Sequence, residues 1–351
     1  MEARTAVTGL ALAVLAVTTG CGSPGTARPS SGTEVEDAGR APAWAGPRAS
    51  PAIEWHGGAR APRPPEQGAW IGAWAKPALG TAQSRMSALA EFEHQLGRQV
   101  DVAHVFHEWR DEFPTEDDRA FAAAGRTVLL SWAGTDTRHL QSGADDEVIR
   151  ARARALKEWG APVLLEWRWE MDRPNLRAEV WSAEDYVAAW KHLRAVFAEE
   201  GVDNAAWVWC PLASGFADGR AQAFYPGDDA VDWVCADTYP GRTVKPFSVA
   251  VGPFLDWAQH RPKPVLIGEF GMKESRGEQR RQDWLAETAA FVKTVPQIKG
   301  LVYFDSDRTG ADRKPYDMSL RNAPESMAMF ARTARDPWFD VSGRAAAGSA
   351  R

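Results

Sequence analysis

The chain has 351 residues, and 44% of them are hydrophobic, which is enough for a large globular domain and excludes a disordered chain. Its 41 basic and 47 acidic residues give a net charge of -6, and no cluster of Lys and Arg with interleaved aromatics indicates a groove for nucleic acid. We therefore expect no nucleic-acid partner. The chain has 17 tryptophans but only 5 tyrosines, and large aromatic faces suit either a big core or stacking on sugar rings.

The N-terminus predicts an export signal. A basic start precedes an apolar run over residues 6–17, which is too short to span a bilayer. The sequence TTGC follows and resembles a bacterial lipobox, with Thr where Leu is usual. We therefore expect a signal peptide over residues 1–20 and lipidation of Cys21, so that the exported protein contacts the membrane only through its lipid. Ordinary cleavage that leaves a free cysteine is the alternative.

Two segments have the composition of flexible chain. Residues 22–66 are rich in Gly, Pro, Ser, Ala and Arg without a period, as in GSPGTARPSSG, which predicts a flexible linker. Residues 340–351, which end in GRAAAGSAR, predict a disordered tail. The globular domain is therefore expected over residues 67–339.

Within this domain, short apolar runs alternate with amphipathic segments, which is the pattern of repeated βα units. The expected strands are 69–75, 100–109, 127–134, 162–171, 204–212, 230–239, 263–272 and 299–307. The expected helices are 86–97, 117–125, 146–160, 182–201, 249–260, 279–293 and 324–334. Eight strands in about 270 residues predict an α/β fold, a (β/α)8 TIM barrel with a single catalytic domain. A doubly wound open sheet is the alternative, but no glycine-rich phosphate turn follows an early strand.

A barrel of this kind carries its active site at the C-terminal ends of its strands. Charged and aromatic residues collect at or just after those ends, at Trp74, Lys76, His107, Trp109, Trp132, Arg168, Glu170, Trp209, Asp237, Tyr239, Glu269, Asp305 and Asp307. The sequence therefore predicts a polar and aromatic pocket at one end of the barrel.

Two glutamates need an explanation, Glu170 at the end of the fourth strand and Glu269 at the end of the seventh. A buried carboxylate is costly unless it is paired or used. One explanation is that each glutamate pairs with a base such as Arg168 and braces the top of the barrel. We favour the other, because both glutamates are expected to point into one Trp-rimmed pocket. In a retaining glycosidase, two carboxyl groups about 5 Å apart act as acid/base and nucleophile.

Four stretches then carry a resemblance to a known family. WRWEMDRP at the fourth strand, AWVWCP at the fifth, FYPGDDAVDWVCADTYP at the sixth and PVLIGEFG at the seventh resemble glycoside hydrolase family 26, typified by endo-β-mannanases. The resemblance covers residues 67–339. It implies that Glu170 is the acid/base and Glu269 the nucleophile.

The same resemblance implies substrate-binding roles for residues on other strands. It implies that Tyr239 hydrogen-bonds the nucleophile and that Asp237 contacts sugar. Trp132 resembles a tryptophan that floors the subsite where cleavage occurs, and His107 matches a sugar ligand on the second strand.

The fourth strand also departs from the family pattern. The usual Arg-x-x-His-Glu-Met-Asn becomes EWRWEMD here, so that Trp169 replaces the His and Asp172 the Asn. Asn175 stands where an aromatic sugar platform is often found. These departures bear on substrate choice and on activity, and they leave both carboxylates in place.

Alternation along the fourth strand predicts a column of charges. If Glu170 points into the barrel, Arg168 and Glu166 point inward below it. We expect Arg168 to hold the ionised Glu269 or to tune its neighbours, and Glu166 to balance Arg168.

The tryptophans divide by position. Those in helical stripes are expected in the core, namely Trp159, Trp190, Trp257 and Trp284. Trp132, Trp209 and one of Trp167 or Trp169 are expected to contact sugar, because stacking needs a rigid aromatic at the pocket mouth.

The remaining cysteines and the histidines give no sign of metal chemistry. Cys210 and Cys235 form either a disulfide or two buried free thiols, and we favour the thiols because a core of this size needs no cross-link. His104 and His107 lie on opposite faces of one strand, so they cannot share a metal. We expect no metal and no cofactor.

The sequence therefore predicts an exported, lipid-anchored, monomeric glycosidase that cleaves a β-linked polysaccharide internally. The resemblance favours β-1,4-mannan or glucomannan, with mixed-linkage β-1,3-1,4-glucan or xylan next. A surface glycan-binding lipoprotein without turnover is a second possibility, and a structural envelope protein a weaker third. Two carboxylates held together against their mutual repulsion argue against a pure binding protein.

Overall fold

The computed structural model describes residue 46, residues 51–307 and residues 317–343. The expected signal peptide over 1–20, the lipidation site Cys21 and most of the expected linker lie outside the described residues, as does 344–351 of the expected tail. Within the described part of the chain, no helix combines the length and the apolar character needed to cross a membrane.

The strands form one closed parallel barrel, in which each pairs with the next and β1 pairs with β8. This confirms the predicted (β/α)8 TIM barrel. The strands are β1 (Trp70–Ala75), β2 (Val102–His107), β3 (Thr127–Trp132), β4 (Val163–Trp167), β5 (Ala205–Trp209), β6 (Trp233–Cys235), β7 (Val265–Phe270) and β8 (Ile298–Asp305).

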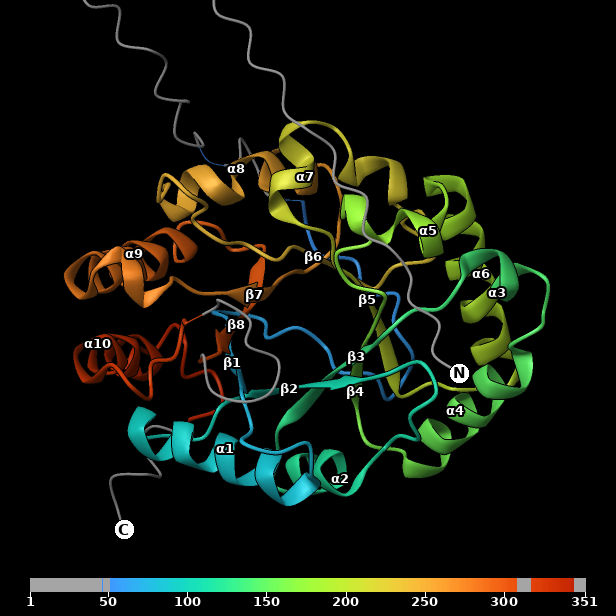
Figure 1. Cartoon of the computed structure of the whole chain (residues 1–351), viewed down its shortest axis with the longest axis horizontal. Helices are drawn as coiled ribbons and strands as arrows, with labels where there is room; N and C mark the ends of the chain where they lie inside the picture. The colour runs from blue at the N-terminus through green and yellow to red at the C-terminus, as the bar shows by residue number, and fades with distance from the viewer. Residues whose placement is uncertain (1–45, 47–50, 308–316, 344–351) are drawn as a thin grey trace, which may run out of the picture. The chain divides into compact units, whose positions relative to one another are not determined.

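Helices surround the strands (Figure 1). They are α1 (Ala82–Leu96), α2 (Glu116–Ala123), α3 (Thr137–Gln141), α4 (Asp146–Trp159), α5 (Arg177–Val180), α6 (Ala183–Glu199), α7 (Ala213–Ala217), α8 (Phe247–Ala258), α9 (Glu278–Val292) and α10 (Pro324–Arg335). Short 3-10 helices are η1 (Pro174–Leu176), η2 (Ala221–Phe224) and η3 (Glu274–Arg276).

Local signals explain where the longer helices begin and end. Ser182 caps α6, because its hydroxyl accepts a hydrogen bond from the Asp185 amide at 3.0 Å. Thr81 caps α1 in the same way, so this helix begins four residues before the expected start at 86. Gly160 ends α4 with a left-handed backbone that a residue without Cβ adopts at little cost.

Strand register fixes which side chains face the inside of the barrel. Phe106, Ser131 and Glu166 pair in register across β2, β3 and β4 and face inward, whereas their successors His107, Trp132 and Trp167 face the helices. A compact inner cluster fills the barrel with one or two side chains per strand. The larger apolar cluster lies between the strands and the helices, so both faces of each strand are buried.

The segment before β1 differs from the prediction of a flexible linker up to residue 66. The Glu54 amide donates a hydrogen bond to the Pro262 carbonyl at 2.8 Å, and Arg60 forms an ion pair with Asp203. Ala61 is buried in the inner cluster. Residues 51–66 therefore pack at the N-terminal end of the barrel, because their apolar side chains cover the inner cluster from below.

Candidate active site

Three carboxylates from three strands meet at the C-terminal end of the barrel. Glu170 follows β4, Asp237 follows β6 and Glu269 lies in β7, and one carboxylate oxygen of each lies within 4.8 Å of the others. All three side chains are buried. The structure therefore brings together the two glutamates singled out in the sequence and adds Asp237 beside them.

The chain around Glu170 is not a regular strand. Arg168 and Glu170 have φ angles of 52° and 50°, which a residue with a Cβ adopts at a cost. The Glu170 amide donates a hydrogen bond to the Cys210 carbonyl at 2.7 Å, which fixes this conformation. The alternation of inward and outward side chains along β4 therefore ends at Trp167. Glu170 faces the other carboxylates because of this irregular backbone and not because of strand periodicity.

The predicted charge column is consequently wrong at Arg168. The Arg168 side chain leaves the pocket, passes over Gly134 and donates a hydrogen bond to Glu179 at 2.5 Å. Because the positive φ of Arg168 turns its side chain away from the barrel interior, Arg168 neither holds Glu269 nor contacts sugar from inside the barrel. Glu166 does point inward, as predicted, but Arg168 is not its partner.

Arg173 is the basic residue of the site, and sequence reasoning missed it. Its guanidinium forms an ion pair with Glu170, three residues earlier in the chain. Its charge also acts on Glu269 and Asp237. Only the sequence Glu-Met-Asp-Arg could have indicated this pair, and an i, i+3 contact requires a turn that the expected strand over 162–171 did not include.

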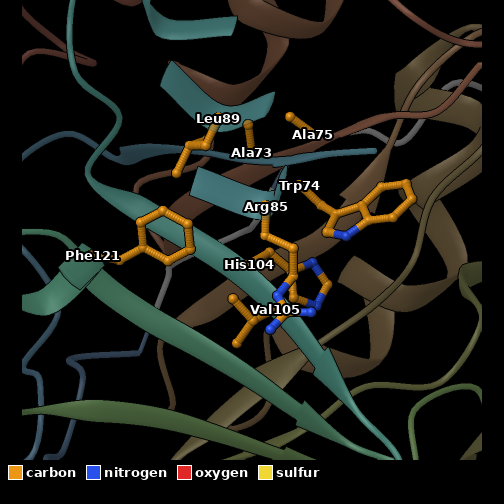
Figure 2. A pocket seen from close by; sticks show the side chains of 8 residues that line it. All are labelled: Ala73, Trp74, Ala75, Arg85, Leu89, His104, Val105 and Phe121. Carbon is orange, nitrogen blue, oxygen red and sulfur yellow. The ribbon is translucent and has the colours of Figure 1, made fainter. Parts of the chain in front are cut away.

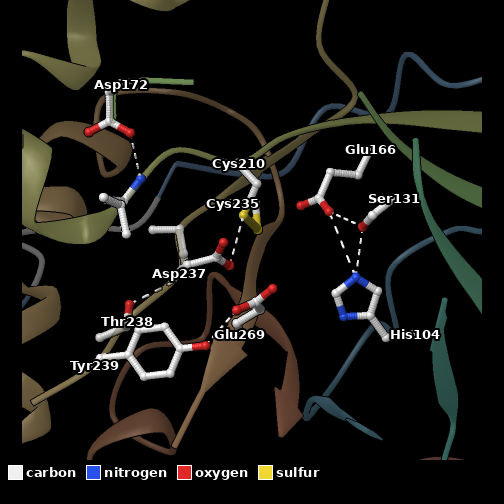
Figure 3. The surroundings of a disulfide bond; sticks show 12 residues. His104, Ser131, Glu166, Asp172, Cys210, Cys235, Asp237, Thr238, Tyr239 and Glu269 are labelled. Atoms are coloured by element: carbon white, nitrogen blue, oxygen red, sulfur yellow. Dashed lines mark hydrogen bonds and ion pairs between the residues drawn. A yellow bond between two sulfur atoms is a disulfide. The ribbon is translucent and has the colours of Figure 1, made fainter. Parts of the chain in front are cut away.

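The environment of the site keeps Glu170 protonated. Burial and the neighbouring charge of Glu269 raise the pKa of Glu170 to about 8, against the opposing effect of Arg173. Burial and the charge of Glu269 also raise the pKa of Asp237 well above its usual range. Tyr239 donates a hydrogen bond to Glu269 at 2.5 Å, which stabilises the ionised form of that carboxylate (Figure 3). The site thus holds a carboxyl with a raised pKa, Glu170, beside a carboxylate that accepts a hydrogen bond from Tyr239.

A second buried polar group lies one layer deeper in the barrel. Ser131 donates a hydrogen bond to Glu166, and His104 Nε2 lies 2.7 Å from Ser131 Oγ (Figure 3). Burial lowers the pKa of His104 to about 3, so the ring is neutral. Burial and the charge of Glu170 raise the pKa of Glu166 to about 8. Glu166 is therefore a largely neutral carboxyl that contacts Ser131 and His104.

A disulfide joins Cys210 and Cys235 beside these carboxyls, so the interpretation as two free thiols is wrong. The sulfurs lie within 4.8 Å of a Glu166 oxygen, and Cys210 Sγ lies 3.3 Å from Asp237 Oδ1 (Figure 3). The inward positions at the ends of β5 and β6 place the two side chains next to each other. The expectation failed because it asked whether the core needs a cross-link and not whether the strands align the cysteines.

Aromatic rings form the opposite half of the pocket. Trp74 stacks on Phe304 with ring centroids 4.4 Å apart, and Phe106 lies 5.7 Å from Trp74 and 5.0 Å from Trp169. All four rings are partly exposed. The ends of β8, β1 and β2 and the residue before Glu170 therefore supply an apolar wall that faces the carboxylates of β4, β6 and β7. Of the two alternatives for a sugar contact, Trp167 and Trp169, it is Trp169 that lies in this wall.

Three predicted substrate ligands lie outside the pocket. Trp132 is fully buried and stacks on Trp109, and Trp209 is fully buried against Trp257. His107 is buried and its Nε2 lies 3.0 Å from Asp118. These three side chains, together with Trp167, occupy outward positions of their strands and form the core between barrel and helices. The predicted roles of Trp132, Trp209 and His107 in sugar binding are therefore contradicted.

A small cavity lies between strands β1 and β2 and helices α1 and α2, beside Trp74, Arg85 and His104 (Figure 2). Its lining includes Ala73, Leu89, Val105 and Phe121. Neither glutamate borders it, so we assign it no role in the chemistry. Among the described residues, Glu170, Asp237 and Glu269 also form a group of three carboxylates close enough together to hold a metal ion. Arg173 forms an ion pair with Glu170, and Tyr239 donates a hydrogen bond to Glu269. These contacts favour proton chemistry over metal binding.

Comparison with known proteins agrees with the site. Residues 125–249 match the model described as Glycosyl hydrolase family 26, a stretch that includes Glu170, Asp237 and Tyr239. Endoglucanase H of Acetivibrio thermocellus is 26% identical over 280 residues, which are 74% of this chain and 30% of that protein. A β-1,3-xylanase of a Vibrio species is 29% identical over 143 residues, which are 38% of this chain and 28% of that protein. The chain thus spans less than a third of the length of these curated relatives.

Solved structures share the fold at low identity. A family 26 β-mannanase from Bacteroides ovatus superposes with a TM-score of 0.58 at 15% identity, over 78% of this chain and 90% of that one. A β-mannanase from a symbiotic protist of the termite Reticulitermes speratus gives a TM-score of 0.55 at 14% identity, over 83% and 97%.

Proposed function

We propose that this chain belongs to glycoside hydrolase family 26 and is a retaining endo-glycosidase that cleaves a β-linked polysaccharide. One observation carries the proposal. One carboxylate oxygen of Glu170 and one of Glu269 lie within 4.8 Å of each other, and retaining glycosidases hold their two carboxyl groups about 5 Å apart. Inverting enzymes leave a wider gap for a water molecule, so this spacing supports retention.

In the first step, Glu269 attacks the anomeric carbon while Glu170 gives its proton to the leaving oxygen. Tyr239 holds Glu269 in place through its hydrogen bond, and the raised pKa of Glu170 keeps a proton available near neutral pH. The glycosidic bond breaks, a sugar ester of Glu269 forms, and the shortened chain leaves with the proton.

In the second step, Glu170 accepts a proton from a water molecule that attacks the ester carbon. Once Glu269 is esterified its negative charge is gone, and this charge was a cause of the raised pKa of Glu170. The positive charge of Arg173 remains beside Glu170. The pKa of Glu170 therefore falls when the residue has to act as a base, and two inversions give net retention.

For the substrate we propose β-1,4-mannan or glucomannan. The structures with a similar fold that are described above are β-mannanases, which supports this choice. The partly exposed wall of Trp74, Phe106, Trp169 and Phe304 offers flat faces for pyranose rings of a neutral polymer. The curated relatives are named as an endoglucanase and as β-1,3-xylanases, so β-glucan and xylan are the next candidates.

The experiment is hydrolysis of a polysaccharide panel. The purified domain, residues 51–351, is incubated with mannan, glucomannan, mixed-linkage β-glucan, β-1,4-xylan and β-1,3-xylan, and reducing ends are followed over time. Release of oligosaccharides of several lengths from one polymer, lost in Glu269→Ala, supports an endo-glycosidase. Release from none of the five polymers contradicts the proposal.

A glycan-binding protein without turnover is the second candidate. The ion pair between Arg173 and Glu170 favours it, because a cation stabilises the carboxylate form, which has no proton to give. Binding of a polysaccharide without any release of reducing ends would favour this candidate over the enzyme.

We also propose that the protein is exported and anchored by a lipid on Cys21, as a monomer that binds polysaccharide. The disulfide between Cys210 and Cys235 supports export, because such bonds persist in oxidising compartments. Labelling of the full chain with a radioactive fatty acid in a bacterial host tests the anchor. Label in the wild type and none in Cys21→Ala supports it, and equal label in both contradicts it.

A further inference from the structure

Trp181 is unusual among the tryptophans in the described part of the chain because its ring is open to solvent. Its exposed fraction is 47%, and Leu79 is the other exposed large hydrophobic residue in the described part of the chain. Trp181 ends α5 with a φ angle of 60°, a conformation that costs free energy for a bulky residue. Strain of this kind persists where the surrounding structure fixes the residue, and it concentrates at functional positions.

Neighbouring side chains hold the ring in one orientation. The Trp181 indole N–H donates a hydrogen bond to Asp136 at 3.0 Å. The guanidinium carbon of Arg138 lies 4.3 Å from the ring centroid, so Arg138 covers one face. Asp136 is itself fixed, because it accepts hydrogen bonds from the amides of Arg138 and His139 as the cap of α3. With one edge bonded and one face covered, the remaining exposure belongs to the opposite face and the outer edge.

Trp181 belongs to the same end of the barrel as the carboxylates. It lies in the connection between β4 and α6, which begins with Glu170 and continues through Arg173 and α5. Its hydrogen-bond partner Asp136 lies in the connection between β3 and α3. Both connections follow the C-terminal ends of their strands, so the ring stands on the rim of the face that carries the pocket.

We propose that Trp181 is a carbohydrate-binding platform on which a sugar ring of the bound polysaccharide stacks, on the leaving-group side of the cleavage point. The inference rests on the proposed function. It follows from the role of Glu170, which protonates the leaving oxygen, so the departing part of the chain runs past the connection that carries Glu170 and Trp181. A pre-oriented aromatic ring with one free face is the side chain that suits the apolar face of a pyranose.

A protein partner fits this surface less well. Asp136 and Arg138 contact the ring, and Leu79 lies in the connection after β1, so the two exposed hydrophobic residues belong to different loops. Contiguous apolar patches mark protein interfaces, whereas one rigid ring among polar groups suits a sugar.

The test compares Trp181→Ala, Trp181→Phe and the control Leu79→Ala, which removes the other exposed hydrophobic side chain. For each, kcat and KM are measured on a long oligosaccharide of the cleaved polymer and on an aryl glycoside with an activated leaving group. We expect Trp181→Ala to raise KM for the oligosaccharide about three- to tenfold, with a much smaller change for the aryl glycoside, and Phe to restore most of the loss. Equal changes on both substrates, or a similar loss in Leu79→Ala, would overturn the inference.

A binding arm separates this inference from the proposed function. Polysaccharide binding is measured by affinity electrophoresis with Glu170→Gln, with and without Trp181→Ala. Weaker binding in the double variant supports the platform even where the wild type hydrolyses none of the polymers, an outcome that contradicts the enzyme alone. Equal binding by both variants, or no binding by either, overturns the platform.

Discussion

Glu170 reaches the site through an irregular backbone. Positive φ angles at Arg168 and Glu170 end the alternation of β4, so Arg168 turns toward Glu179 while Glu170 turns toward Glu269. Arg173 then returns to Glu170 across one turn of chain. The strain at these residues is compensated by the hydrogen bond from the Glu170 amide to Cys210, and it places the proton donor opposite the nucleophile.

The two glutamates are expected to fail differently when they are replaced. Glu170→Gln removes the proton donor, so turnover of polysaccharide should fall at least about a hundredfold, while formation of the glycosyl enzyme from an activated aryl glycoside should persist. Glu269→Ala removes the nucleophile and should stop both reactions. Initial rates on the two substrates check this, with Glu147→Gln on the exposed face of α4 as the control. Similar residual activity on both substrates in Glu170→Gln would refute the assignment.

Arg173 should set the alkaline limit of activity. The acid form of Glu170 is needed for the first step, so kcat/KM should fall as pH rises through its pKa of about 8. The cation lowers that pKa, so Arg173→Gln should move the limb to higher pH by roughly half a unit to one unit and should slow the second step. Arg173→Lys should restore part of both effects.

The measurement is a pH profile of kcat/KM combined with a burst experiment on an aryl glycoside. If the alkaline limb of the kcat/KM profile stays at the same pH in Arg173→Gln and no glycosyl enzyme accumulates, the ion pair has no part in the reaction.

At the residue scale, the sequence predicted Glu170 and Glu269, because a charge at the end of an apolar run is costly and therefore visible. It did not predict the positions of Arg168 or Arg173, because no residue pattern reveals left-handed backbone at a charged residue. Trp132 and His107 were expected in the pocket but face the helices. Buried parallel strands are apolar on both faces, so the sequence does not show which alternate residues point into the barrel.

At the scale of single elements, β7 passes very close to its neighbours. A Cβ at Gly268 would lie 2.6 Å from Cys235 Sγ, 2.9 Å from Cys210 Sγ and 2.9 Å from Asp237 Oδ1. The disulfide, Asp237 and the absence of a side chain at Gly268 therefore fit one another. The positions of Asp237 and Glu269 depend on this contact, since Glu269 follows Gly268 directly.

Gly268→Ala is therefore expected to destabilise the fold and to disturb the site. The methyl group meets the rigid disulfide and a buried carboxyl, so the free energy of unfolding should fall by about 1–3 kcal/mol. Urea unfolding measures this. Gly80→Ala is the matched control, because nothing lies within 4 Å of its added Cβ, and its effect should stay within about 0.5 kcal/mol. Equal stability of the two variants would contradict the close contact at β7.

The sequence predicts the type and order of the helices and strands, but not the residues at which they begin and end. Apolar runs in the sequence predict all eight strands. The fourth and sixth strands are shorter than expected, because apolar residues continue past their ends at Trp167 and Cys235. The chain after these ends is irregular and forms the site. The disulfide depends on the register between β5 and β6, which the sequence does not contain.

At the scale of the whole barrel, acidic groups are stacked in its interior. Glu166 forms one layer, and Glu170, Asp237 and Glu269 form the next. Burial raises the pKa of Glu166 from 4.5 to about 8, so the folded state binds this proton more tightly than the unfolded state does. The resulting stabilisation is present below pH 4.5 and is lost as pH rises toward 8.

Glu166→Gln should remove this pH dependence in part. Between pH 5 and pH 8 the free energy of unfolding of the wild type should fall by on the order of 1–3 kcal/mol more than that of the variant. For each protein, the change in the free energy of unfolding is taken between the two pH values. Any effect of losing the Ser131 hydrogen bond in the variant is the same at both pH values and therefore cancels. Urea unfolding at both pH values provides the comparison, and parallel curves for the two proteins would contradict a raised pKa at Glu166.

The double displacement by Glu170 and Glu269 is tested most directly by the anomeric configuration of the first product. Proton NMR spectra of a cleaved manno-oligosaccharide, or of an oligosaccharide of whichever polymer is hydrolysed, are recorded before mutarotation. We expect the β-anomer to appear first and to equilibrate later with the α-anomer. First appearance of the α-anomer would show inversion and contradict a covalent intermediate on Glu269.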